Sequence, residues 1–324
     1  MNRKLISIVT PCYNEELNVL EHFRQVSEVI ESYRSEFDFE HIYTDNASRD
    51  KTFEVLARIA DEHPNVKVVR FSNNIGANRA IFMGLKLAKG DAVVLIQADL
   101  QDPPAIISKF IDYWKEGYEV VYGKIQTREE GFMLNNFRRL YYYLIDSFSD
   151  VPIPQGAGEF RITSRRVLDA LLSYQEDDLY IRGAIARIGF RQMPIPYERL
   201  ARHKGESSNN YLRLTSYAIN GFVSTSIAPI RMVSTLGIFF AFIGFLLTFL
   251  ILLSRIFFPE AAPQGFTTLA TLITFFAGLQ LLGIGIIGEY MRKTYLQVLS
   301  RPLGFIEKSV NLDELDGKRN FAEK

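Results

Sequence analysis

Two long runs without charged residues constrain this chain most strongly. Residues 232–254 and 266–288 each contain 23 consecutive positions without Asp, Glu, Lys or Arg. At about 1.5 Å rise per residue, each run would form a helix of roughly 35 Å, and the apolar core of a bilayer is about 30 Å thick. The sequence therefore predicts two membrane-spanning helices joined by a short loop at 255–265. A buried helical hairpin in a large soluble domain is the less favoured alternative.

Basic residues flank this pair of runs and predict its orientation. Only Arg255 lies in the connecting loop. The flanks hold Arg202, Lys204, Arg213, Arg231, Arg292, Lys293 and Arg301. Because basic residues concentrate on the cytoplasmic side, we expect the N-terminal region and both termini to be cytoplasmic. The apolar stretch at residues 5–9 is too short for a signal peptide.

Composition narrows the remaining classes. The chain has 37 basic and 37 acidic residues, so no net charge favours binding to nucleic acid. Its single cysteine, Cys12, excludes an internal disulfide and a zinc-finger framework. Residues 209–229 suit either a helix lying in the lipid headgroup layer or an amphipathic core helix. Four glycines between 278 and 288 permit close helix contact, which suggests a homo-oligomer.

The first 116 residues alternate between strand and helix patterns. Apolar β-rich runs predict strands at 5–10, 41–44, 66–71 and 92–97. Helical spacing of apolar residues predicts helices at 16–33, 52–62, 78–88 and 105–116. This alternation indicates an α/β fold with a mostly parallel sheet covered on both faces. Ligands of such sheets bind at the carboxyl ends of the strands.

Polar clusters follow three of the predicted strands, at residues 11–15, 45–50 and 97–102. No G-x-G-x-x-G or P-loop motif is present, which disfavours a dinucleotide-dependent dehydrogenase and a P-loop enzyme. A nucleotide site built on carboxylates needs a divalent cation between them and a diphosphate. We place Mg²⁺ or Mn²⁺ at Asp99 with Gln101 or Asp102.

Several of these residues also have structural interpretations. Asp50 suits a turn before the next helix, and we interpret it as structural. Asp102 precedes two prolines and is equally well a helix start or a metal ligand. Taken singly, Tyr13 suits packing and Glu15 suits the first turn of a helix.

Seven segments together resemble a known family. They are PCYNEE (11–16), TDNASRD (44–50), NIGANRA (74–80), GDAVVLIQADLQDPP (90–104), VVYGK (120–124), GAGEFRI (156–162) and RHKGESS (202–208). The chain resembles the family 2 glycosyltransferases of GT-A fold, within them the polyprenyl-phosphate group of dolichol-phosphate mannose synthases and bactoprenol glucosyltransferases. The resemblance implies a GT-A catalytic domain at 1–208, a juxtamembrane amphipathic helix at 209–229, a two-helix anchor at 230–290 and a cytoplasmic extension at 291–324, in a bacterial inner membrane.

The resemblance also implies roles for individual residues. The base and ribose of a nucleotide would be bordered by Pro11, Tyr13, Asn14 and Glu15, with Asp45 on the base. Asp99 matches the last acid of a metal-binding D-x-D whose first position is Gln97, and Gln101 would be a further ligand. Phosphate groups would be handled by Lys124, Arg138 or Arg139, Arg202 and Lys204. Glu159 would position the sugar or act as a base. The sequence departs from the family pattern at three positions. Asn46 and Gln97 stand where the family usually has an acid, and Glu159 stands where it usually has Asp.

The expected function is transfer of a sugar, with inversion, from a nucleoside diphosphate sugar to the phosphate of a membrane polyprenyl phosphate. The resemblance favours UDP-glucose as the sugar donor, and it implies that the transfer takes place at the cytoplasmic face of the bilayer. Three alternatives remain: a transferase acting on a hydroxyl-bearing lipid such as diacylglycerol, a processive polysaccharide synthase, and a non-catalytic scaffold that binds nucleotide sugars.

Overall fold

The structure is a computed structural model that describes residues 3–126, 156–174, 179–200, 265–299 and 301–312, with scattered positions between 230 and 257. The chain divides into two compact units. The first comprises Met1–Ser147, Val151–Ser224 and Ser300–Lys324, and the second comprises Phe148–Asp150 and Thr225–Leu299.

An eight-stranded sheet organises the first unit, with the strand order β7-β5-β6-β4-β1-β2-β3-β8. The strands are β1 (Lys4–Cys12), β2 (Phe37–Asp45), β3 (Val66–Phe71), β4 (Ala92–Leu95), β5 (Val120–Ile125), β6 (Ala157–Ser164), β7 (Gln192–Tyr197) and β8 (Ile306–Val310). Only β6 and β8 run antiparallel to their neighbours. The predicted α/β class with a mostly parallel sheet is therefore confirmed.

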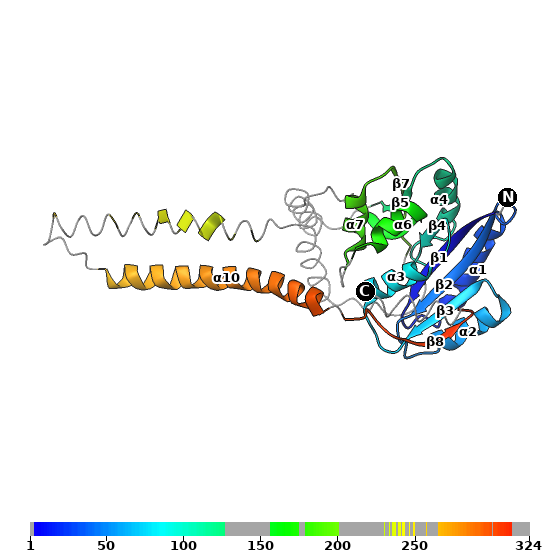
Figure 1. The fold of residues 1–324 in the computed structure, drawn as a ribbon, viewed down its shortest axis with the longest axis horizontal. Coiled ribbons are helices and arrows are strands. Elements are labelled where there is room, and N and C mark those ends of the chain that lie inside the picture. Colours follow the sequence, from blue (N-terminus) through cyan, green and yellow to red (C-terminus); the bar gives the residue numbers. More distant parts are fainter. Residues whose placement is uncertain are drawn as a thin grey trace. The chain divides into compact units, whose positions relative to one another are not determined.

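Helices cover both faces of this sheet (Figure 1). They are α1 (Val19–Glu31), α2 (Thr52–Glu62), α3 (Ala77–Leu87), α4 (Ile106–Lys115), α6 (Arg165–Leu172) and α7 (Ile181–Ile188). The buried residues of α3, α6 and α7 belong to one hydrophobic cluster. Those of α1, α2 and α4 belong to two clusters on the other face. The predicted helices and strands up to residue 116 all form. Most of their ends differ from the predicted ones by a few residues.

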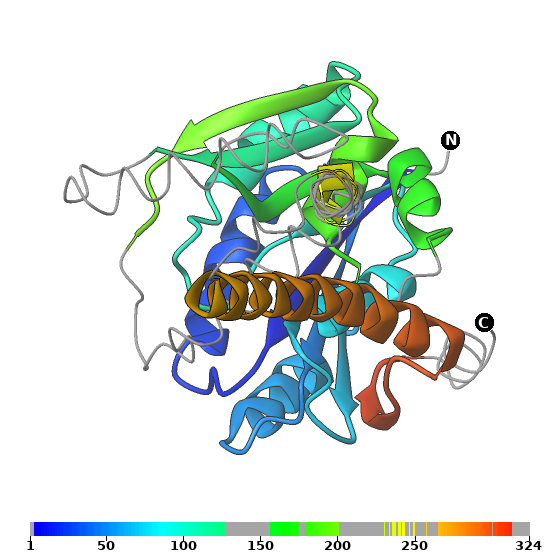
Figure 2. The same ribbon diagram turned by 90° about the vertical axis from the view of Figure 1, so that its left-hand side faces the viewer.

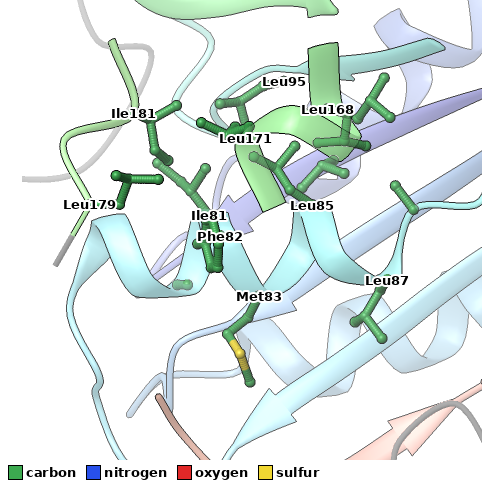
Figure 3. Close-up of a cluster of buried hydrophobic side chains, with 14 of the residues drawn as sticks. Ile81, Phe82, Met83, Leu85, Leu87, Leu95, Leu168, Leu171, Leu179 and Ile181 are labelled. Carbon is green, nitrogen blue, oxygen red and sulfur yellow. The ribbon is translucent and has the colours of Figure 1, made fainter. Parts of the chain in front are cut away.

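The core beneath α3 shows why this helix forms where it does. Ile81, Phe82 and Leu85 recur at helical spacing and meet Leu168 and Leu171 of α6 (Figure 3). Each such side chain contributes about 1.5–3 kcal/mol on full burial. The helix lies close to the sheet, since a Cβ atom at Gly84 would be 2.6 Å from Val9 Cγ1.

The C-terminal segment adds an edge strand that the sequence did not indicate. Strand β8, coloured red-orange in Figures 1 and 2, pairs antiparallel with β3. The side chain of Asn311 donates hydrogen bonds to Ala60 O at 2.6 Å and to Val66 O at 2.9 Å. Sequence-distant parts of the chain therefore complete one sheet.

The membrane prediction is contradicted. The second uncharged run lies in α10 (Phe266–Leu299), a helix that continues into charged residues such as Glu289 and Arg292. In the part of the chain that the structure describes, no helix combines the length and the apolarity needed to cross a membrane. A run without charged residues does not by itself ensure that a helix is both long enough and apolar enough to cross a membrane. This finding contradicts the predicted localisation as an integral membrane protein with two spans. Most of 232–254 and all of 209–229 lie outside the described residues.

Candidate functional site

One edge of the sheet collects the polar residues that the sequence singled out. The register pairs Cys12 with Asp45 and Val9 with Leu95, so β1, β2 and β4 end side by side. Because β5 and β7 run in the same direction and β6 runs against them, this edge also holds the carboxyl ends of β5 and β7 and the amino end of β6. The edge is therefore the candidate ligand site.

The loops after β1 and β2 brace each other. Asn14 N donates to Ser48 Oγ at 2.9 Å, and Arg49 N donates to Asn14 Oδ1 at 2.8 Å. Asn46 N donates to Cys12 O at 2.9 Å. Asn14, which the sequence assigned to the nucleotide, thus uses its backbone and side chain to hold the two loops together, while Tyr13 beside it is partly exposed.

Two acids next to these loops have structural partners. Glu15 is buried, and its Oε2 accepts a hydrogen bond from Asn18 Nδ2 at 2.6 Å. Asp50 Oδ1 accepts from Thr52 N at 3.0 Å, and Asp50 Oδ2 accepts from Glu16 N at 3.1 Å. The structural interpretation of Asp50 is confirmed. Pro11 lies inside β1 and is partly buried.

Asp45 is the most enclosed acid of the edge. Its side chain has no exposed surface, and its Oδ1 accepts a hydrogen bond from Ser48 N at 3.1 Å. Its Oδ2 accepts no hydrogen bond from any described residue, although Arg70 Nε lies 3.8 Å away. Burial raises the pKa of Asp45 above its ordinary value. A buried acceptor without a donor is uncommon and is suited to a ligand N–H.

The loop after β4 carries the predicted metal residues. Asp99 is buried, and its Oδ1 accepts a hydrogen bond from Gln101 N at 3.1 Å. Leu200 N donates to Gln101 O at 2.9 Å, which ties this loop to the segment after β7. Gln97 directly follows the strand and is partly exposed.

Asp102 lies beside this loop in contact with residues that the sequence did not single out. Tyr197 Oη donates to Asp102 Oδ1 at 2.5 Å, and Arg199 Nε lies 3.4 Å from the same oxygen. Burial raises the pKa of Asp102 and also raises the pKa of Tyr197. Helix α4 begins at Ile106 without a side-chain cap, so Asp102 is not a helix cap.

Glu159, at the amino end of β6, is held by two guanidinium groups. Arg182 Nε lies 2.8 Å from Glu159 Oε1, and Arg161 Nη2 lies 3.7 Å from Glu159 Oε2. Burial lowers the pKa of Arg161, which also donates to Gly158 O. Both carboxylate oxygens of Glu159 thus lie next to guanidinium groups that hold the side chain in place, an arrangement that suits a positioning role. Lys124, at the end of β5, is exposed.

The sequence missed the basic and phenolic residues of this edge: Arg70, Arg161, Arg182, Tyr197 and Arg199. Four of them lie between residues 117 and 208, where the sequence predicted no strand or helix. Arg161 lies inside the segment GAGEFRI, which is the one signal that pointed to it. The remaining predicted phosphate-binding residues lie outside the described residues: Arg138, Arg139, Arg202 and Lys204.

The described residues of this edge could hold a divalent cation only together with a ligand. Within the described ranges no group of three or more His, Cys, Asp and Glu side chains could hold a metal ion by itself. Mg²⁺ is often held by one or two carboxylates together with substrate phosphates, and not by a complete protein cage. Asp99, with amide oxygens from Gln97 or Gln101, fits that kind of donor set.

Comparison with known proteins identifies the family. The model of the family described as "Glycosyl transferase family 2" matches residues 7–172, about half of the chain, from β1 through α6. The chain belongs to glycosyl transferase family 2. Membership confirms the enzyme class and the GT-A-like α/β fold, so this family 2 protein is a glycosyltransferase.

Curated relatives match nearly the whole length of this family 2 glycosyltransferase. An uncharacterized glycosyltransferase, YkcC of Bacillus subtilis, is 34% identical over 309 residues, which cover 95% of this chain and 94% of the relative. The SfII prophage-derived bactoprenol glucosyl transferase of Shigella flexneri is 32% identical over 305 residues, with 94% and 98% covered. Among solved structures, the mannosyltransferase PcManGT of Pyrobaculum calidifontis in complex with GDP-Man and Mn²⁺ is similar at 23% identity and a TM-score of 0.43, covering 60% of this chain and 55% of that chain.

Proposed function

We propose that this glycosyltransferase moves glucose from UDP-glucose to the phosphate of a polyprenyl phosphate, with inversion at the anomeric carbon. The observation that carries the proposal is the match, at 32% identity and over 94% of this chain, to a bactoprenol glucosyl transferase. The match also covers 98% of that relative's length.

The donor base belongs at the end of β2 in this proposal. Uracil carries an imide N–H, and Asp45 Oδ2 is a buried acceptor without a donor among the described residues. Leaving such an acceptor unsatisfied costs about 1–3 kcal/mol, so a donor N–H at this place would gain a comparable amount. Pro11 and Tyr13 precede the braced loop and would border the base and ribose.

The diphosphate belongs near the loop after β4. Asp99, with Gln97 or Gln101, would hold Mg²⁺ or Mn²⁺, which when bound would neutralise the charge of the departing diphosphate. Tyr197 and Arg199 hold the Asp102 carboxylate beside this loop. Lys124, exposed at the end of β5, would add positive charge to the same edge.

The acceptor needs little help from a base. A phosphate monoester has a second pKa near 6 and is mostly dianionic at neutral pH, so it already is a nucleophile. The remaining task of the chain is to bring two anions together, which guanidinium groups do well because they bind phosphate oxygens in pairs. We assign acceptor binding to Arg202 and Lys204 and to Arg138 or Arg139, with Glu159 positioning the sugar.

A transfer assay tests this function. Purified protein, radiolabelled UDP-glucose, Mg²⁺ and polyprenyl phosphate in detergent should form a glycolipid that mild acid cleaves. Product on diacylglycerol alone would support the hydroxyl-lipid alternative, and nucleotide binding without product on any acceptor would support the scaffold.

Asp99→Asn should abolish transfer in that assay, because the amide keeps the shape of the carboxylate and removes the charge that a cation needs. The matched control is Asp61→Asn, an exposed acid of α2 that should retain full activity. Substantial turnover by the Asp99 variant would remove the metal assignment.

A further inference from the structure

Arg70 is a link between the proposed base pocket and the C-terminal strand. Its position in β3 pairs with Asp45 of β2 in the parallel register, so the two side chains are neighbours. Arg70 Nη2 donates to Ser48 O at 3.1 Å, and the guanidinium lies over the ring of Phe53 at 5.4 Å. Arg70 thus contacts the loop after β2, whose Ser48 also donates a hydrogen bond to Asp45.

Glu307 of β8 competes with Asp45 for this guanidinium. Arg70 Nε lies 3.2 Å from Glu307 Oε2 and 3.8 Å from Asp45 Oδ2. The shorter separation belongs to the partly exposed Glu307, and Oδ2 of the buried Asp45 accepts no hydrogen bond from any described residue. Since charge attraction alone would draw Arg70 to the fully buried Asp45, Glu307 changes which acid Arg70 meets.

An irregularity in the β3–β8 ladder places Glu307 there. Lys308 is the register partner of Arg70 and Ile306 is the partner of Phe71, so Glu307 is the extra residue between them. Such bulges turn a side chain away from the normal alternation of a strand and occur next to active sites.

The segment around Glu307 is anchored on both sides. Ser72 N donates to Phe305 O at 2.9 Å before the bulge. Asn311 donates to two backbone carbonyls after it. A side chain on a segment fixed at both ends can hold a neighbour at a set distance.

We propose that Glu307 is a positioning residue of the donor site: it holds the Arg70 guanidinium off Asp45, so that Asp45 Oδ2 stays open to the imide N–H of the donor base. This inference rests on the proposed function, since it takes Asp45 as the base contact. It makes the C-terminal strand a part of the donor site, although that strand lies outside the residues matched by the family model.

The test is Glu307→Gln in the full-length protein, because glutamine keeps the size of the side chain and loses the charge. Arg70 then closes on Asp45, and the base has to displace it. We expect UDP to bind about ten-fold more weakly, which corresponds to about 1.4 kcal/mol, and the KM for UDP-glucose to rise alike. The kcat at saturating donor and the KM for polyprenyl phosphate should stay within about two-fold, since neither depends on this contact.

A double-variant cycle separates this role from a merely structural one. In an Arg70→Gln background no guanidinium remains to close on Asp45, so Glu307→Gln should have no further effect on UDP affinity. If Glu307→Gln weakens UDP binding equally with Arg70 and with Gln at position 70, the inference is wrong. Ser309→Ala, on the same strand, is the matched control and should bind UDP normally, and thermal unfolding of each variant checks that the fold is retained.

Asp45→Ala distinguishes the two levels of the proposal. If this variant binds UDP as tightly as the unchanged protein, the base contact in the proposed function fails. If it loses affinity while Glu307→Gln does not, the proposed function stands and only the positioning role of Glu307 is wrong.

Discussion

Asn14, Ala47 and Leu100 have positive φ angles of 54°, 56° and 57°, and each lies in a different loop of the candidate edge. For residues other than glycine, this left-handed conformation costs about 1–2 kcal/mol. Asn14 offsets part of the cost through its side-chain hydrogen bond to the loop after β2. Local strain is thus concentrated where the three strands end, as is common at ligand sites.

A buried histidine makes the stability of the protein depend on pH. His22 of α1 has no exposed surface, and its Nδ1 lies 3.1 Å from Tyr43 Oη. The ring of His41 lies next to that of His22, with the two ring centroids 5.8 Å apart. Burial lowers the pKa of His22 from 6.5 to about 3 and also lowers the pKa of His41. The folded state therefore keeps both rings neutral at pH values where an unfolded chain binds protons.

We expect the free energy of unfolding to fall as the pH drops from 6.5 towards 3, by up to about 1.4 kcal/mol per pH unit for each such histidine. Above pH 6.5 this contribution is fully present. Urea unfolding at a series of pH values measures the slope, and His22→Leu should make it shallower because one protonatable group is removed. An unchanged slope in this variant would contradict the assignment, whatever its stability at pH 7.

At the scale of elements, the pairing of β5 with β7 places the Tyr197 side chain beside Asp102. Gly123 of β5 lies under the ring of Tyr197, and an added Cβ would be 2.6 Å from Tyr197 Cε1. The hydroxyl of that tyrosine is the donor to Asp102. The absence of a side chain at Gly123 therefore decides where a group of the candidate site lies.

Gly123→Ala should displace the Tyr197 ring, weaken its hydrogen bond to Asp102, destabilise the protein by about 1–3 kcal/mol and slow transfer. Denaturant unfolding and the transfer assay measure the two effects. Gly158→Ala is the matched comparison for stability, because its added Cβ would meet atoms at 3.8 Å or beyond, which is ordinary contact. Equal destabilisation by the two substitutions would contradict the steric argument.

At the scale of the whole molecule, Asn311 closes the first unit by joining the end of β8 to Ala60 and Val66, about 250 residues earlier. Its φ of 57° is also left-handed. Asn311→Gly keeps that conformation accessible and removes the hydrogen bonds, which should cost about 1–2 kcal/mol.

Asn311→Ala loses the bonds and adds strain, so it should unfold at a still lower denaturant concentration. We expect the unfolding midpoint to be highest with Asn at position 311, lower with Gly and lowest with Ala. If the alanine variant unfolds at the same or a higher denaturant concentration than the glycine variant, the left-handed backbone conformation at residue 311 does not contribute to stability.

Much of the candidate site was predictable from sequence because its signals are local. A strand followed by a polar cluster and a helix is recognisable over about twenty residues, and parallel strands bring such clusters to one edge. Asp45 and Asp99 were located in this way. Arg70, Tyr197 and Arg199 were not, because each meets its acid across the sheet or from a segment distant in sequence, and no local pattern records a pairing of strands.

Alone, the sequence determined the alternation of strands and helices up to residue 116, the mostly parallel sheet, and the family, since these follow from hydrophobic spacing and from short motifs. Tertiary structure alone decided that β8 returns to β3 and that Glu307 reaches Arg70. The physical reason is range: apolar periodicity acts between residues a few positions apart, whereas strand partners and buried ion pairs depend on which surfaces meet once the chain has folded.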